Sequence, residues 1–340
     1  MTKMWLAGAL AASFTGGALA DPARADTLKD VEARGVVNCG VSQGLIGFSI
    51  ADDKGAWSGF DVDFCRALAA AIFNDPTKVA YTPLSATERF DALRDKKIDV
   101  LSRNSTWTMG RELDSGIIFA GVTYYDGQAF LVAKARGLQS ALELDGSKVC
   151  VQAGTTTEPN FIDFFSTNHM SYEIVRGETL AETIDAYKSG KCDVLTSDES
   201  QLFALRLEMT KPEDHVILPE VISKEPLGPA VRQDDMQWFN IVKWLHFALL
   251  DAEELGVSSA SVVDAAKSQK PSVQRLLGAE GDFGKRLGLT NDWAANAIRL
   301  VGNYGEIFER NVGVRSRLGI PRGLNELWTN GGIQYAPPIR

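Results

Sequence analysis

The 340-residue sequence has few of the side chains from which metal sites are built. It contains three histidines and four cysteines, and no two cysteines form a Cys-x-x-Cys pair. A structural zinc site requires about four closely spaced Cys or His ligands. We therefore expect no metal site, and we expect no cofactor.

Basic residues are in the minority. The chain has 35 Lys and Arg against 44 Asp and Glu, for a formal net charge of −9 at pH 7. Nucleic acids and anionic membranes attract basic surfaces, so this balance argues against both as partners. The sequence also lacks internal repeats and low-complexity segments.

Long apolar runs are absent after the first 25 residues. The initial run, Trp5–Leu19, is shorter than the ~20 residues of a bilayer span, is rich in Gly and Ala, and precedes two Ala-x-Ala sites. We expect residues 1–25 to form a signal peptide, cleaved after Ala20 or after Ala25. The second site is favoured because Asp26-Thr27-Leu28 begins a plausible helix. The mature protein is expected to be exported and soluble.

Strand and helix patterns alternate through the first two thirds of the chain, which predicts an α/β fold with mostly parallel sheets flanked by helices. The first unit has expected strands at 36–41, 79–82 and 98–101 and expected helices at 62–73 and 89–94. The second unit has expected strands at 148–152 and 192–196, a helix that begins at 158, and a helix at 180–189. The length remaining after export suits two lobes.

Two segments are expected to cross between the lobes, at 127–131 and 224–231. The second contains Pro226 and Pro229, which suit an extended segment. Two such crossings form a hinge below a cleft. We therefore expect lobe 1 at 26–128, lobe 2 at 129–229, and a return to lobe 1 at 230–340 with a helical C-terminal extension. Helices are expected there at 236–255, 272–277 and 293–308.

The even number of cysteines suits disulfides in an oxidising compartment, where three pairings are possible. Sequence order and the strand pattern favour Cys39 with Cys65 and Cys150 with Cys192, which gives one bridge in each lobe.

The segment Ser102–Arg111 places hydroxyls and two guanidinium groups directly after an expected strand. Ligands of such sheets bind at the carboxyl ends of strands, and an Arg fork can bind a carboxylate with two hydrogen bonds. The alternative is a polar surface loop whose arginines pair with Glu112 or Asp114. The segment alone does not decide between them.

The stretch Gly59-Phe60-Asp61-Val62-Asp63-Phe64 resembles the signature of the bacterial family 3 solute-binding proteins, the periplasmic receptors of amino-acid ABC transporters. Further stretches resemble the general L-amino-acid-binding branch: 61–67, 101–104, 124–128, 223–229, 302–306 and 322–325. The resemblance extends over nearly the whole mature chain. It implies a two-lobed periplasmic binding protein, a monomer in the periplasm, which binds an L-amino acid and delivers it to inner-membrane ABC permease subunits.

The resemblance also implies roles for individual residues. Arg111 matches the residue that binds the ligand α-carboxylate, with Thr106 and the backbone of Asn104 beside it, and Asp198 matches the partner of the α-ammonium group. Arg103 is a second, lower-ranked cation whose side chain could instead point into the lobe. The lobe 2 contributions are Thr155, Thr156 and Thr157. These threonines could equally cap the following helix, and Asp198 could be an ordinary cap after a strand.

The remaining part of the expected pocket surrounds the ligand side chain. Alignment places Ser42, Gln43, Leu45, Phe48, Ala86 and Gln152 there. Several glutamine-type receptors have an aromatic residue where this chain has Leu45 and Ala86. This departure implies a roomier pocket that accepts several polar L-amino acids, such as glutamate, glutamine and aspartate.

A periplasmic enzyme on the same scaffold, similar to a dehydratase, is the main alternative. Such an enzyme needs a general acid or base in the cleft. None of His169, His215 and His246 falls in an expected turn at a strand end. A sensor or structural role is disfavoured because we find no fused kinase, anchor or repeat. We therefore expect a binding protein rather than an enzyme.

Overall fold

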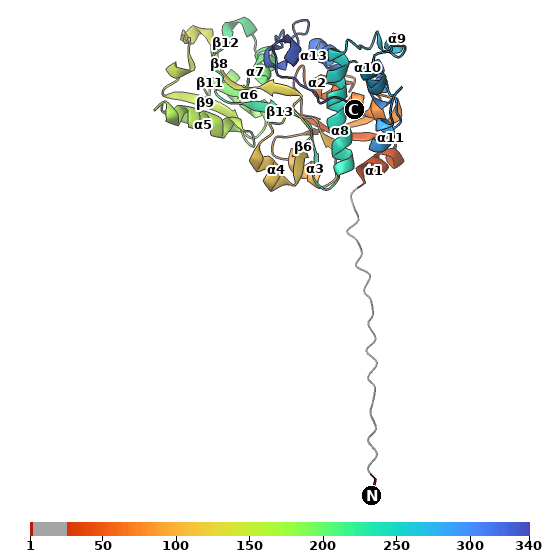
Figure 1. The fold of residues 1–340 in the computed structure, drawn as a ribbon. Helices are drawn as coiled ribbons and strands as arrows, with labels where there is room; N and C mark the ends of the chain where they lie inside the picture. Colours follow the sequence, from red (N-terminus) through yellow and green to blue (C-terminus); the bar gives the residue numbers. More distant parts are fainter. Residues whose placement is uncertain (3–25) are drawn as a thin grey trace.

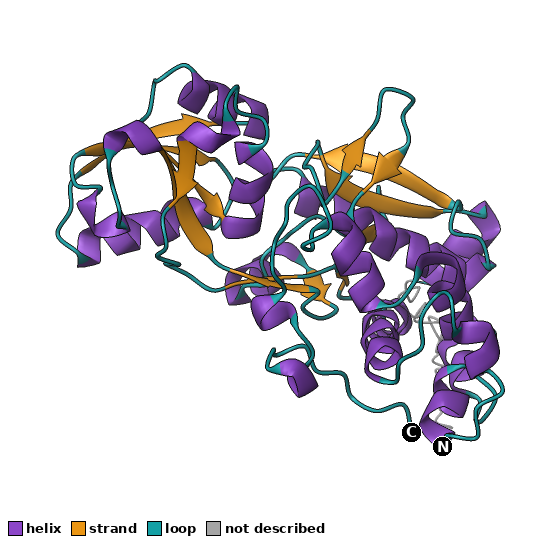
Figure 2. Cartoon of the chain, turned by 90° about the horizontal axis from the view of Figure 1, so that it is seen from above, coloured by secondary structure: helices purple, strands orange, loops and turns teal. Residues whose placement is uncertain are grey.

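The computed structural model describes residues 1–2 and 26–340, and residues 26–340 form two lobes joined by extended segments (Figures 1 and 2). Residues 3–25, with the expected signal peptide and both cleavage sites, lie outside the described part of the chain. The first described helix, α1 (Thr27–Arg34), begins after Asp26, whose side chain accepts a hydrogen bond from the Lys29 backbone. The helix start predicted at Asp26 is therefore confirmed.

Lobe 1 contains a five-stranded sheet of order β4-β1-β5-β14-β6. Strands β4 and β5 run parallel to β1, and β14 is antiparallel to both of its neighbours. The strand bounds are β1 Val37–Ser42, β4 Val79–Leu84, β5 Val100–Leu101, β6 Ile117–Phe119 and β14 Ala230–Arg232. A small antiparallel pair, β2 (Ile50–Ala51) and β3 (Trp57–Ser58), follows β1 in the sequence and forms a separate two-stranded sheet.

Lobe 2 repeats this arrangement, with a five-stranded sheet of order β10-β9-β11-β8-β12. Strands β10 and β11 run parallel to β9, and β8 is antiparallel to both of its neighbours. The strand bounds are β8 Gln128–Ala133, β9 Ser147–Gln152, β10 Tyr172–Gly177, β11 Val194–Asp198 and β12 His215–Ile217. The expected mostly parallel sheets are confirmed, and each contains one antiparallel strand with the same place in the strand order.

Those two antiparallel strands are the ones that enter each sheet after a crossing. The crossing segments pair with each other as β7 (Tyr124–Asp126) and β13 (Glu225–Leu227), in a separate antiparallel two-stranded sheet. We call this pair the hinge. β8 joins the second sheet after β7, and β14 joins the first after β13. We propose that the lobes meet at the boundaries 128/129 and 229/230, and this strand pairing supports that division.

Helices cover the faces of both sheets (Figure 1). In lobe 1 and its C-terminal part the helices are α1, α2 Phe60–Phe73, α3 Arg89–Arg94, α4 Met109–Ser115, α8 Met236–Glu254, α9 Val262–Ala265, α10 Pro271–Leu276, α11 Phe283–Leu287, α12 Trp293–Val301 and α13 Tyr304–Asn311. In lobe 2 they are α5 Thr157–Thr167, α6 Leu180–Lys188 and α7 Glu199–Arg206. Short 3-10 helices lie at η1 Lys134–Arg136, η2 Ala141–Glu143, η3 Pro212–Asp214, η4 Gly323–Asn325 and η5 Trp328–Asn330. None of the described helices is both long and apolar enough to cross a bilayer.

The single helix predicted over 293–308 is wrong, because the chain breaks it into α12 and α13. Gly302 adopts a φ of 106°, which favours glycine, and Asn303 starts the next helix. The Asn303 side chain accepts from the Glu306 backbone, and the Glu306 side chain accepts from the Asn303 backbone. This capping box was readable from the spacing of Asn303 and Glu306, and apolar periodicity alone concealed it.

Both expected disulfides are confirmed, and each lies within one lobe. Cys39 on β1 bonds to Cys65 on α2, with their Cα atoms 6.3 Å apart. Cys150 on β9 bonds to Cys192, which lies just before the neighbouring strand β11, with their Cα atoms 5.7 Å apart. Each disulfide therefore joins a strand to an adjacent element of its own lobe, and neither disulfide links the two lobes across the hinge.

The C-terminal extension braces the hinge. The buried side chain of Asn325 accepts a hydrogen bond from the backbone N–H of Tyr125 at 2.7 Å and donates one to its carbonyl oxygen at 3.0 Å. Two further side chains reach the residue just before β7: the hydroxyl of Tyr304 donates to the Thr123 carbonyl at 2.9 Å, and Gln334 donates to it at 3.3 Å. The extension thus satisfies hinge backbone groups that β13 does not pair.

We predict that Asn325→Ala lowers the free energy of unfolding by about 1–3 kcal/mol, because it leaves a donor and an acceptor of the hinge without partners. Urea titration followed by circular dichroism measures this change. Asn330→Ala, at an exposed position of the same extension, is the control and should have little effect. A loss no larger than that of the control contradicts this role for Asn325.

Candidate functional site

One pocket gathers side chains from both lobes. From lobe 1 it is lined by Ser42, Leu45, Arg89, Arg103, Asn104, Thr106 and Arg111. From lobe 2 it is lined by Gln152, Thr155, Thr156, Thr157, Leu180, Ser197, Asp198 and Gln201. Ser42, Gln152 and Asp198 are the last residues of β1, β9 and β11. The interlobe pocket therefore lies at the carboxyl ends of strands in both sheets, where α/β sheets bind ligands.

Most of the residues singled out from the sequence line this pocket together. They are Arg111, Thr106, Asn104, Thr155, Thr156, Thr157, Asp198, Leu45, Gln152 and Ser42, together with the lower-ranked Arg103. The structure places Gln43, Ala86 and Phe48 elsewhere. Gln43 is exposed, and Phe48 packs edge-on against Phe60 and Tyr124 in the core.

Ala86 is buried where the two lobes approach each other. A Cβ atom at Gly154 of lobe 2 would lie 3.4 Å from the carbonyl carbon of Ala86 and 2.8 Å from the Thr87 side chain. Gly154 also has a φ of 73°. Both the close approach and the backbone conformation favour glycine at this turn.

Arg111 lies in the first turn of α4, where Thr108 caps the helix by accepting from the Arg111 backbone. Its guanidinium donates to the carbonyl oxygen of Thr106 at 2.7 Å and lies over the ring of Phe90. Burial lowers the pKa of Arg111, while Glu225 and Asp198 act in the opposite direction. An Arg side chain stays protonated under such shifts, so the pocket holds a fixed positive charge here.

Asp198 ends β11 and is 7% exposed. Burial raises its pKa well above the usual range, the negative charges of Asp126 and Glu225 add to this, and Arg111 and Arg89 oppose it. The pKa of Asp126, on hinge strand β7, is also raised, to about 7, chiefly by burial. A cationic group beside Asp198 would stabilise its ionised form.

The threonines of lobe 2 are not ordinary caps. Thr156 precedes α5 in the cap position, yet its side chain makes no capping hydrogen bond, and its hydroxyl donates to Glu225 at 2.8 Å. The hydroxyl of Thr155 donates to the Gln152 carbonyl at 2.7 Å and contacts that of Thr157. The Thr156 side chain therefore leaves the first backbone N–H groups of α5 available to a ligand.

Glu225, which the sequence analysis missed, bonds to two residues of the pocket wall, Thr106 and Thr156. Its carboxylate is buried on hinge strand β13 and accepts hydrogen bonds from Thr106 at 2.5 Å, Thr156 at 2.8 Å, Asn160 at 2.6 Å and Ser223 at 2.8 Å. It therefore links lobe 1, lobe 2 and the hinge. A carboxylate within an expected crossing segment was the only available signal.

Asn104 contributes differently from what the resemblance implied. Its backbone N–H donates to Asp61 at 2.9 Å, so it is already paired within lobe 1. Its side-chain amide donates across the cleft to Gln201 at 3.2 Å, and its Oδ1 atom is buried without a partner among the described residues.

Arg89 was also missed, because an arginine at the start of a predicted helix is typical of an exposed position. It begins α3, five residues after β4 ends, and it is 3% exposed in the pocket wall. Its position shortly after a strand end was a signal that the sequence analysis left unused.

The described residues offer neither a metal cluster nor a histidine in the pocket wall. No group of three or more His, Cys, Asp or Glu side chains within residues 26–340 is arranged to hold a metal ion. His246 is buried against Tyr304, and His215 contacts the hydroxyl of Tyr187 at 2.9 Å. Within the described part of the chain, the interlobe pocket is thus suited to binding opposite charges and has no imidazole for acid–base chemistry.

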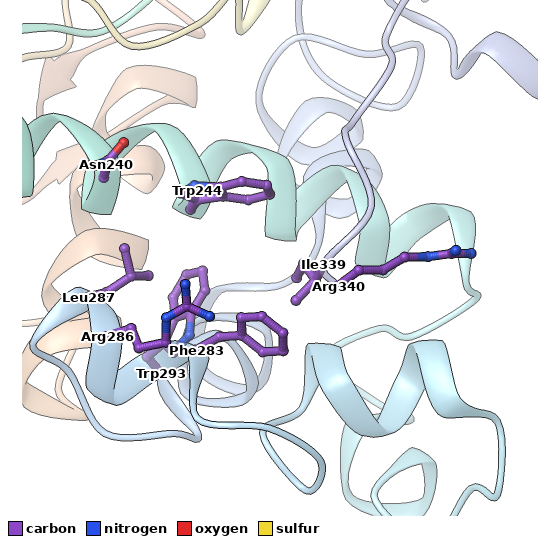
Figure 3. A pocket seen from close by; sticks show the side chains of 8 residues that line it. All are labelled: Asn240, Trp244, Phe283, Arg286, Leu287, Trp293, Ile339 and Arg340. Carbon is purple, nitrogen blue, oxygen red and sulfur yellow. The ribbon is translucent and has the colours of Figure 1, made fainter.

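A second cavity, of about 310 Å³, lies in lobe 1 between α8, α11 and the C-terminal residues (Figure 3). Trp244 and Phe283 contribute much of its apolar wall, and Arg286 supplies a charge. None of the residues expected to bind a ligand lines it. The interlobe pocket is therefore the candidate site.

Known proteins match this chain over most of its length, both in sequence and in structure. The profile of the bacterial extracellular solute-binding proteins, family 3, matches residues 37–246. The general L-amino acid-binding periplasmic protein AapJ of Rhizobium johnstonii is 58% identical over 94% of this chain and 95% of its own length. The glutamate/glutamine/aspartate/asparagine-binding protein BztA of Rhodobacter capsulatus is 50% identical over 95% of this chain and 96% of its own length. A solved ABC transporter/periplasmic binding protein from Brucella ovis with glutathione bound has a TM-score of 0.92 and 55% identity, and the match covers 93% of this chain and 100% of that one.

We predict that Asp126→Asn stabilises the protein more at pH 8 than at pH 5. The pKa of Asp126 is about 7 in the folded protein, against an ordinary value of 3.8. Between these values the folded state binds more protons than the unfolded state, so the free energy of unfolding falls as the pH rises. Asparagine removes this loss and keeps an oxygen that can accept from the Gly127 backbone.

Thermal unfolding at both pH values measures the effect. We expect the gain from Asp126→Asn to be larger at pH 8 by at least about 1 kcal/mol. Asp53→Asn, at an exposed position, is the control. A difference between variant and wild type that does not change with pH would be evidence against the raised pKa of Asp126.

Proposed function

The chain belongs to the bacterial extracellular solute-binding proteins, family 3, and on this premise we propose that its interlobe pocket binds an L-amino acid between Arg111 and Asp198. Relatives that share half or more of its residues are named as amino-acid-binding proteins. The chain is the substrate-binding component of an amino-acid ABC transporter and is not an enzyme. It has the two-lobed fold of the periplasmic binding proteins.

The observation that carries the proposal for the site is that a guanidinium group from lobe 1 and a carboxyl group from lobe 2 line one pocket. The Arg111 guanidinium can receive the α-carboxylate with two parallel hydrogen bonds. The Asp198 carboxylate can receive the α-ammonium group, which would replace the solvation that Asp198 has lost. A ligand that touches both groups favours the arrangement in which the lobes are together.

The neighbours of Arg111 support this geometry. The Thr106 carbonyl holds one end of the guanidinium, and the Thr106 hydroxyl donates to Glu225. We assign Thr106 the role of positioning Arg111. We assign the backbone N–H groups at Thr155, Thr156 and Thr157 the role of closing on the same carboxylate from lobe 2.

Several polar L-amino acids are the proposed ligands, with glutamate, glutamine and aspartate foremost. The name of the Rhodobacter capsulatus relative includes all three. Glutathione is a second candidate because the Brucella ovis structure contains it. Its glutamyl end carries a free carboxylate and a free ammonium group, the same pair that Arg111 and Asp198 complement.

We further propose that the protein is exported by the signal peptide expected in residues 1–25 and acts in the periplasm as a monomer. There it would deliver its ligand to inner-membrane permease subunits. Its acidic net charge disfavours nucleic acid as a partner.

The dehydratase-like alternative has little support. One solved relative, 28% identical with a TM-score of 0.55, is an ancestral amino acid-binding protein that is a precursor of cyclohexadienyl dehydratase.

We predict that Arg111→Gln and Asp198→Asn each weaken the binding of glutamate by more than tenfold, since a charged hydrogen bond contributes roughly 1.5–3 kcal/mol. Isothermal titration calorimetry measures the change. Asp163→Asn, at an exposed position on α5, is the control and should bind as the wild type does. Wild-type affinity in either pocket variant would refute its proposed role.

The function as a whole is tested by titrating the wild-type protein with a panel of L-amino acids and with glutathione. We expect several polar amino acids to bind, and we expect mass spectrometry of the purified protein to find a free amino acid or a glutamyl compound. Nanomolar binding of one amino acid alone would contradict the proposed breadth. The absence of any amino-acid binding would contradict the function.

A further inference from the structure

The interlobe pocket is lined by more guanidinium groups than an amino-acid zwitterion requires. Its lining includes Arg89, Arg103 and Arg111, and Asp198 is the only acid in that lining among the described residues. The proposed function uses Arg111 and Asp198. Two guanidinium groups remain, and both are buried, with Arg89 3% exposed and Arg103 7% exposed.

The protein itself accounts for Arg103. Its Nε atom donates to the carbonyl oxygen of Leu84 at 3.0 Å. Asp61, which is close enough to raise the pKa of Arg103 against the effect of burial, supplies a compensating charge within lobe 1. Arg103 is thus held by its own lobe.

Arg89 lacks such a hydrogen-bonded partner. Within the described part of the chain, its charge is offset only by Asp198, which the proposed function assigns to the ligand ammonium group, and by the ring of Phe90, whose centroid lies 4.8 Å from the guanidinium carbon. Among the described residues its Nε atom has no hydrogen-bond acceptor, and it forms no ion pair. Its one hydrogen bond, from Nη2 to the Gly154 carbonyl, is long at 3.4 Å. Burial and the charges of Arg103 and Arg111 lower its pKa well below the usual range. A buried cation in this situation is costly unless an anion joins it.

The contact with Gly154 locates the Arg89 guanidinium at the turn of lobe 2 that follows β9. Gln152 ends that strand and is 6% exposed, and its Nε2 atom also has no partner among the described residues. Two buried donors from opposite lobes, one of them cationic, therefore lack acceptors in one pocket. An anionic oxygen group is their chemical complement.

We propose that Arg89 determines ligand specificity by binding a second carboxylate, so that the site prefers dicarboxylic amino acids. This inference rests on the proposed function, in which Arg111 and Asp198 bind the α-carboxylate and α-ammonium groups. Gln152 assists by donating to the same carboxylate from lobe 2. Amino acids with a neutral amide side chain still bind, but without the charge that Arg89 complements.

Isothermal titration calorimetry with L-glutamate and L-glutamine separates charge from shape, because the two ligands are nearly isosteric. We expect wild-type protein to bind glutamate about tenfold or more tightly than glutamine. We expect Arg89→Gln to weaken glutamate binding by about tenfold to hundredfold and to change glutamine binding less than threefold. Arg89→Lys keeps the charge and should retain part of the preference.

Arg94→Gln is the matched control, since Arg94 lies on the same helix and forms an exposed ion pair with Asp91. Its preference for glutamate should equal that of the wild type. Equal losses for both ligands in Arg89→Gln would overturn the inference by indicating a structural role. Wild-type protein that binds glutamine as tightly as glutamate would also overturn it, whether or not the variant folds. Wild-type protein that binds neither ligand would refute the proposed function and, with it, this inference.

Discussion

The carboxylate of Glu225 is the point at which both lobes and the hinge meet. A buried carboxylate is costly unless hydrogen bonds replace its hydration, and here four donors do so. Because Thr106 comes from lobe 1, Thr156 and Asn160 come from lobe 2, and Ser223 precedes the hinge strand β13, these donors surround the carboxylate only when the lobes lie together. The position of the interlobe pocket and the pairs of side chains that face each other across it depend on this constraint.

Placing charges at the carboxyl edges of two facing sheets has an electrostatic cost. Asp198 and the hinge residue Asp126 both have raised pKa values, chiefly because they are buried, and Arg111 and Arg89 have lowered ones for the same reason. Each charge is only partly compensated by the others. The remaining imbalance is what a ligand of complementary charge would relieve, so the electrostatic cost of the pocket is also a source of its selectivity.

The rest of the molecule holds this arrangement in place. One disulfide in each lobe ties a sheet strand to an adjacent element. The C-terminal extension bonds to the hinge through Asn325, and the ring of Phe308 on α13 stacks on Tyr124 of β7, with centroids 5.8 Å apart. The extension therefore does more than enlarge lobe 1: it supports the strand on which the two lobes are connected.

The sequence by itself determined the lobes, the parallel sheets, the cysteine pairing and the charged groups Arg111 and Asp198, because apolar periodicity and a family resemblance both read features that lie close together along the chain. It missed the break at Gly302, although a local capping pattern encodes it. The tertiary structure decided which side chains share the pocket, for example Arg89 rather than Gln43, and it placed Glu225 in contact with the pocket residue Thr106. Whether a side chain near a strand end faces the cleft depends on how two separate sheets are set across a hinge, and that relation exists only after residues more than 100 positions apart have come into contact, as Thr106 and Glu225 do with a sequence separation of 119.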